Sequence, residues 1–212
     1  MNSKLKKRQA VIVIVVFVFL LIIGGFFWWK WKIPEPTYVN STDYEIKDTS
    51  EGKIIENKEE GLTFKVPEGW GVKKYDEGIS LFSPEVEFDQ YGDVLIESLK
   101  EKGGCGVGVK VVEYKSEPAI TIEVGFLRGL INRIQENSTV QESPITIEKR
   151  EVIKVDDKLA LKRIFFHKGE QKSISVEIPI NNTIYSFENG FIFSEKCLQK
   201  FNKFLETVLI NK

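Results

Sequence analysis

The sequence contains few of the residues from which metal and redox centres are built. Among its 212 residues are two Cys and one His. A zinc ribbon, a Cys/His cluster or a haem with two protein ligands depends on such side chains, so we expect neither a metal site nor a bound cofactor. Charge of one sign is also lacking, because 30 Lys and Arg are matched by 31 Asp and Glu, a net charge of −1. A general nucleic-acid-binding protein needs a concentrated basic face, so this balance argues against a nucleic-acid partner.

The motifs of common enzyme sites are missing as well. No G-x-S-x-G, H-E-x-x-H or G-x-x-x-x-G-K occurs, which removes the usual signatures of serine hydrolases, zinc proteases and P-loop proteins. Ser50 and Lys53 match the pattern S-x-x-K, but a pattern this short arises by chance. A thiol nucleophile would need a base, and His167 is the one candidate, which we expect to lie solvated at a strand end. The sequence therefore predicts no catalytic residues and no enzymatic activity.

A long apolar run dominates the N-terminal part. Ala10–Trp29 holds 20 residues, of which 18 are apolar, two are Gly and none is charged. As a helix rising about 1.5 Å per residue, this run would span roughly 30 Å, the hydrocarbon thickness of a bilayer. We therefore expect a transmembrane helix at 10–29, preceded by a basic cytoplasmic tail at 1–9. Because cationic residues are retained on the cytoplasmic side, the remainder is expected to be extracytoplasmic, in a single-pass protein of the cell membrane.

A cleaved signal peptide is the alternative interpretation of the same run. Signal peptides have a shorter apolar region, of about 7–15 residues, which ends in small residues. Here the run closes on the bulky residues Phe26–Trp29, and Trp prefers the headgroup level of a membrane. These features favour an anchor whose partner is membrane lipid.

Beyond the anchor, the sequence predicts a tether and one domain. Residues 30–60 are rich in charge and contain two Pro, so we expect an irregular juxtamembrane tether, in which Lys53–Ile55 could still pair as an edge strand. Residues 61–212 number about 150, a common size for one core. They form the expected extracytoplasmic domain.

Within this domain, apolar periodicity predicts an antiparallel sheet and two helices. Short strands are expected at 62–66, after Trp70 and at 79–83, while the pattern at 94–100 fits neither element. Longer strands are expected at Cys105–Tyr114, Ile145–Val155, Leu159–His167, Ser173–Ile180 and Thr183–Phe193. The last four are joined by two or three residues, so neighbours should be antiparallel. One helix is expected after Ser116, with an apolar face from Ile120 to Ile134, and another after Ser194, which predicts an α+β class.

Four segments resemble PsbP-like domains. They are GLTFKVPEGW (Gly61–Trp70), VDDKLALKR (Val155–Arg163), IPINNTIYSF (Ile178–Phe187) and KCLQKFNKFLETVLI (Lys196–Ile210). The likeness is nearer to small bacterial membrane-anchored members of that superfamily than to the plant photosystem protein. It implies a central antiparallel sheet flanked by helices, an α/β/α sandwich, with a non-enzymatic accessory or binding role. The matched positions are turns and core, so no catalytic or ligand residue is implied.

Two sets of side chains remain as candidate sites. Cys105 and Cys197 both fall in the expected extracytoplasmic domain and could form a disulfide if that compartment is oxidising; the alternative for Cys197 is a small core residue on the apolar face of its helix. An acidic stretch could hold a hard cation such as Ca²⁺, but its spacing matches no Ca²⁺ loop and favours a solvated loop. Its members are Glu85, Glu87, Asp89 and Asp93.

Two classes of function follow from the sequence. The first is a membrane-anchored extracytoplasmic binding or assembly module with a protein partner of unknown identity. The alternative is an extracytoplasmic hydrolase with an unrecognised site. The absence of a nucleophile–base pair in the sequence favours the first.

Overall fold

The computed structural model describes residues 18–24, 36–114, 122–137, 141–142, 146–167, 170–190 and 194–212. They belong to two compact units, Met1–Glu35 and Pro36–Lys212. In the first unit residues 18–24 are helical, and the rest of the span predicted at 10–29 lies outside the described residues. Among the described residues, no helix combines the length and apolar character needed to cross a bilayer.

The fold class predicted from the sequence is wrong. Instead of an α+β sandwich around one central sheet, the structure is mostly β and forms two antiparallel sheets, and the described residues include no membrane-spanning helix. The physical reason lies largely in residues 36–60, which pair as strands rather than forming an irregular tether. The second compact unit accordingly begins at Pro36.

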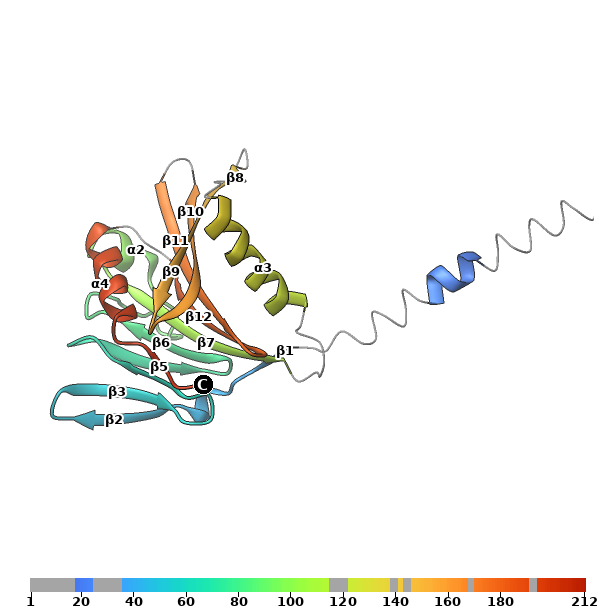
Figure 1. The fold of residues 1–212 in the computed structure, drawn as a ribbon. Coiled ribbons are helices and arrows are strands. Elements are labelled where there is room, and N and C mark those ends of the chain that lie inside the picture. The colour runs from blue at the N-terminus through green and yellow to red at the C-terminus, as the bar shows by residue number, and fades with distance from the viewer. Residues whose placement is uncertain are drawn as a thin grey trace, which may run out of the picture. The chain divides into compact units, whose positions relative to one another are not determined.

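The larger sheet has nine antiparallel strands in the order β5-β6-β7-β12-β11-β10-β9-β8, with β1 beside β7 (Figure 1). The N-terminal members are β1 (Pro36–Tyr38), β5 (Gly71–Tyr75), β6 (Gly78–Phe82) and β7 (Gly106–Tyr114). The C-terminal members are β8 (Gln141–Glu142), β9 (Thr146–Val155), β10 (Lys158–His167), β11 (Glu170–Ile180) and β12 (Thr183–Asn189).

The succession from β9 to β12 confirms the predicted antiparallel strands. Two-residue turns close the hairpin of β9 and β10 and that of β11 and β12. Asp156, Asp157 and Asn181 occupy these turns with positive φ values of 49°, 60° and 50°. Asp and Asn tolerate this left-handed conformation better than other non-Gly residues, so the turn sequences specify tight hairpins.

The smaller sheet has the order β13-β4-β3-β2. Its strands are β2 (Glu45–Thr49), β3 (Gly52–Asn57), β4 (Leu62–Lys65) and β13 (Leu209–Ile210). The 3-10 helix η1 (Ser41–Asp43) precedes β2, and Tyr44 and Ile55 are almost fully buried in the main core. The segment 36–60 is therefore part of the fold.

Three helices complete the second unit: α2 (Ile96–Lys100), α3 (Ile122–Asn137) and α4 (Glu195–Leu205). Figure 1 shows α3 on one face of the larger sheet and α4 on the opposite face. Phe204 of α4 makes ring contacts with Phe64 of β4 and Phe187 of β12, with centroid distances of 5.5 and 6.0 Å. The main core thus lies between the two sheets and α4.

Strand β7 shows how the larger sheet serves both faces. Val107, Val109 and Val111 enter the main core, whereas Val112 and Tyr114 pack in a second cluster with α3. The apolar face of α3 supplies Val124, Leu127 and Ile131 to this second cluster, which confirms the predicted helical spacing. The start predicted near Ser116 lies outside the described residues.

Candidate functional site

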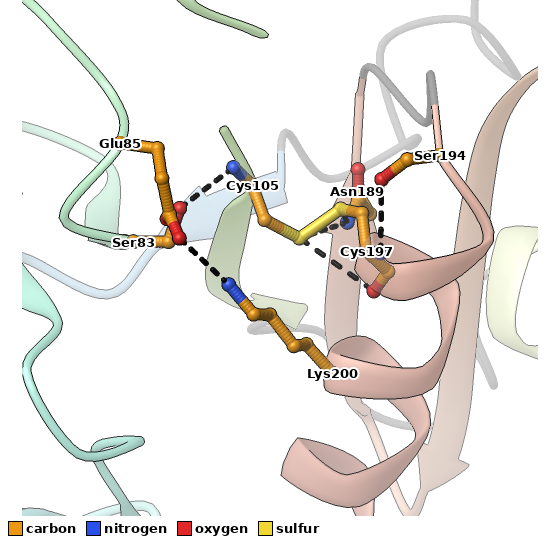
Figure 2. The surroundings of a disulfide bond; sticks show 7 residues. All are labelled: Ser83, Glu85, Cys105, Asn189, Ser194, Cys197 and Lys200. Atoms are coloured by element: carbon orange, nitrogen blue, oxygen red, sulfur yellow. Dashed lines mark hydrogen bonds and ion pairs between the residues drawn. A yellow bond between two sulfur atoms is a disulfide. The ribbon is translucent and has the colours of Figure 1, made fainter. Parts of the chain in front are cut away.

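The two cysteines form a disulfide, which confirms the pairing considered from the sequence. Cys105 precedes β7 and Cys197 lies in the first turn of α4, with their Cα atoms 5.4 Å apart. Ser194 caps α4, because its Oγ accepts a hydrogen bond from the main-chain N–H of Cys197 at 3.2 Å. Figure 2 shows how this capped turn carries Cys197 against Cys105.

The disulfide is wholly enclosed. The two cysteines are 0% and 1% exposed, and Asn189 of β12 is also 0% exposed. The amide nitrogen of Asn189 lies 3.4 Å from the sulfur of Cys105 and 3.1 Å from that of Cys197 (Figure 2). Because both sulfurs are bonded to each other, neither cysteine is a thiolate nucleophile in this form.

A polar network beside the disulfide fixes the loop before α2. Ser83 Oγ accepts a hydrogen bond from the main-chain N–H of Cys105 at 2.9 Å. The pKa of the Glu85 carboxyl is lowered, mainly by a hydrogen bond from the Ser83 side chain and next by one from the main chain of Glu85 itself. The charge of Lys200 lowers this pKa to a smaller extent. Lys200 also lies over the ring of Trp70, 5.7 Å from its centroid. These contacts join α4 to the segments just before β5 and after β6, and we interpret them as structural.

The acidic stretch predicted to be a solvated loop does not converge on one point. Glu85 lies 3.5 Å from Lys200 and Glu87 lies 2.5 Å from Lys102. Asp89 instead accepts hydrogen bonds from the main-chain N–H groups of Tyr91 and Asp93, both at 2.8 Å. Over the part of the chain that the structure describes, no three His, Cys, Asp or Glu side chains gather as metal ligands.

The remaining sequence candidates lie apart from the disulfide. His167 ends β10, where its main chain pairs with Thr146 and Glu170, and its side chain lies outside the described residues. Ser50 and Lys53 lie in and after the turn between β2 and β3. Among the described side chains, Asn189 rather than Ser50 or Lys53 contacts the cysteine sulfurs.

A groove on the α3 face of the larger sheet is the feature that the sequence analysis did not identify. It encloses about 340 Å³, near the lower end of the range for small-ligand sites. Helix α3 forms one wall with Phe126, Leu127 and Leu130. Phe126 is 59% exposed, so part of this apolar wall faces solvent. We name this feature the α3 groove.

The floor of the α3 groove carries four charged side chains from four adjacent strands. Lys110 comes from β7, Glu188 from β12, Glu177 from β11 and Arg163 from β10. Arg163 and Glu177 form an ion pair, while Lys110 lies 3.9 Å from Glu77 outside the groove. The floor therefore offers both signs of charge next to an apolar wall.

A second hollow, of about 460 Å³, lies at the turn between β5 and β6. It is lined by turn residues such as Asp76 and Glu77, by Gly78 and Gly108, and by Lys110, which also lines the α3 groove. Helical side chains do not contribute to it. Since ligand sites combine an apolar surface with a few polar groups, the α3 groove is the better candidate.

No protein-family model and no curated protein matches this chain. The resemblance to PsbP-like domains therefore stays a prediction, carried by the residues in which it was found.

Proposed function

We propose that this protein is an extracytoplasmic binding module without catalytic activity, attached to a membrane by its apolar run at 10–29, and that the α3 groove is its binding site. The observation that carries the proposal is the composition of the groove. Its wall is formed by apolar side chains of α3, including the exposed Phe126, and its floor carries four charged groups. Binding sites for small ligands pair a mostly apolar concave surface with a few polar groups that fix orientation.

The proposed location is supported by two further features. The disulfide between Cys105 and Cys197 is of a kind that persists in oxidising compartments and is rare in the cytosol. The run Ala10–Trp29 has no charged residue and follows a basic tail. The resemblance to PsbP-like domains also predicts a binding or accessory role.

Photo-crosslinking from the groove tests the proposed binding site. A benzophenone amino acid replaces Phe126 in the full chain in intact cells. The matched control places it at Leu209 of β13, which is 49% exposed in the smaller sheet. We expect an adduct from position 126 and little from position 209. No adduct at position 126, or equal yields at both positions, would contradict the assignment.

Protease protection tests the proposed location. Protease added to intact cells or spheroplasts should remove 36–212 and spare the basic tail at 1–9. Protection of the C-terminal unit in cells with a sealed membrane would refute an extracytoplasmic location.

A further inference from the structure

The charges on the floor of the α3 groove form a balanced pattern. Lys110 pairs in register with Ser186, and Ser186 with Glu177. In the adjoining row, Glu188 pairs with Ser175, and Ser175 with Arg163. Two cationic and two anionic groups thus sit within two neighbouring rows of four strands, and their charges sum to zero. A ligand group of one sign would meet a like charge beside every opposite one.

Some hydrogen-bonding capacity of this floor is unused. Within the described residues, Arg163 Nε and Ser175 Oγ are buried without a hydrogen-bond partner. Ser175 is 7% exposed and lies between Arg163 and Glu188 in register. A buried polar group without a partner costs free energy, so the fold leaves hydrogen-bonding capacity unmet beneath this end of the floor.

The apolar part of the groove suits a ligand that has a flexible apolar part. Tyr114, Leu161 and Ile184 lie under α3 and are at most 7% exposed. The apolar surface open to a ligand is provided by Phe126 of α3 and Tyr38 of β1, which are 59% and 43% exposed. These two side chains recognise the ligand by burial of apolar surface. The complementary ligand is an amphiphile whose polar head carries both signs of charge.

The chain itself indicates the source of such a ligand. Pro36 and Tyr38 of β1 line the groove, and only residues 30–35 separate Pro36 from the apolar run that ends at Trp29. A fully extended link of this length spans at most about 25 Å. If the run attaches the protein to a membrane, as proposed above, the groove stays within reach of the membrane surface.

We propose that the α3 groove binds a zwitterionic membrane lipid, with an acyl chain against α3 and the head over the charged floor. The phosphate accepts hydrogen bonds from Lys110 and from the guanidinium group of Arg163, and the ammonium group lies toward Glu188. This inference rests on the proposed function, because it takes the α3 groove as the binding site and the membrane as the source.

Native mass spectrometry of the full chain, released from a non-ionic detergent, tests the ligand class. The lipid probes share one acyl chain and differ in the head: lysophosphatidylethanolamine (zwitterionic), lysophosphatidylglycerol (anionic) and monoacylglycerol (uncharged). We expect the zwitterionic probe to bind about tenfold more tightly than either other lipid, the effect of about one charge-assisted hydrogen bond. A short apolar peptide with free termini is the fourth probe, because it is also zwitterionic.

Three variants locate the binding. Phe126→Asp, at an exposed position of the wall, should abolish binding of the lipid probes at the groove while the circular dichroism spectrum is retained. Lys110→Met should weaken the zwitterionic probe about tenfold and leave the uncharged probe unchanged. The matched control is Lys65→Met on β4 of the smaller sheet, since the two lysine side chains are 45% and 47% exposed. This control should not change the binding of any probe.

The outcomes separate this inference from the function on which it rests. Binding that depends on Phe126 but shows no preference among the three lipid heads refutes the zwitterionic lipid and leaves the groove as the binding site. Tighter binding of the peptide than of any lipid also refutes the lipid. Failure of the crosslinking at position 126, by contrast, refutes the proposed function itself.

Discussion

Loss of the Cys105–Cys197 disulfide should lower the free energy of unfolding of the second unit by about 4.6 kcal/mol, the chain-entropy value for a loop of this size. The bond joins residues separated by 92 positions, so it restricts much of the unfolded chain. Typical domains are stable by only about 5–15 kcal/mol. Removal of the crosslink therefore takes away a large share of the stability. The contacts of the Asn189 amide with both sulfurs are weakened at the same time.

Urea unfolding of 36–212, followed by far-UV circular dichroism, measures this loss. Oxidised protein, reduced protein and the variant C105A/C197A are compared. With a slope of about 2 kcal/mol per M, the midpoint should fall by about 2 M in both the reduced protein and the double variant. Ser194→Ala is the control, because it removes only the cap of α4 and should cost about 1 kcal/mol. Equal midpoints for the oxidised protein and the double variant would refute the reasoning.

Three further substitutions test the packing and the electrostatics. Phe204→Ala, at a residue 1% exposed that contacts both sheets, should cost about 3–5 kcal/mol in the same assay; a loss below 1 kcal/mol would contradict the assigned core. Gly78→Ala would place a Cβ closer to the carbonyl oxygen of Val109 than Cβ atoms come in real structures, so the melting temperature should fall, and an unchanged melting temperature would contradict this steric reasoning. The pKa of Asp156 is lowered in the folded protein, mainly by a hydrogen bond from Lys158 and next by one from the main chain of Ile210. The stability that this carboxylate contributes is therefore fully present above the unfolded-state pKa of about 3.9, and it is lost as the pH falls through the lower pKa of the folded state. Asp156→Asn should therefore make the urea midpoint less dependent on pH below 4, and an unaltered acid profile would argue against this carboxylate as a source of acid sensitivity.

The strands from β9 to β12 were predictable because their information is local. Apolar alternation marks each strand, and the turn residues Asp156, Asp157 and Asn181 accept a left-handed main chain. The cap and apolar face of α4 are equally local, so its start at Ser194 could be placed from the sequence.

The segment 36–60 was not predictable from local patterns. Every residue of β2 is exposed, so its charged sequence carries no apolar alternation. Strand β2 forms because it pairs with β3, and β1 forms because it pairs with β7, about 76 positions later in the chain. Such pairings depend on the rest of the fold. The predictions of an irregular tether and of a single central sheet were wrong for this reason.

The disulfide was foreseeable only as one of two alternatives. The sequence places Cys197 on the apolar side of a helix and Cys105 at the start of a strand, positions that suit core residues as well as a crosslink. What decides between them is the docking of α4 on the larger sheet, through contacts such as Phe204 with Phe187. That docking is a long-range property.

The α3 groove escaped prediction because alternation alone assigns Lys110, Glu177 and Glu188 to the solvent side of their strands. A signal was nevertheless present in β7, β10 and β12. Consecutive apolar pairs occur there, and in each pair one residue enters the main core while the other packs with α3. These pairs are Val111–Val112, Ala160–Leu161 and Ile184–Tyr185. A strand end that is apolar on both faces must be covered on both faces. The neighbouring parts of these strands carry charged residues on the α3 side and lie beyond the part that α3 covers. The groove forms at that boundary, where the helix stops shielding the sheet and its charged residues begin.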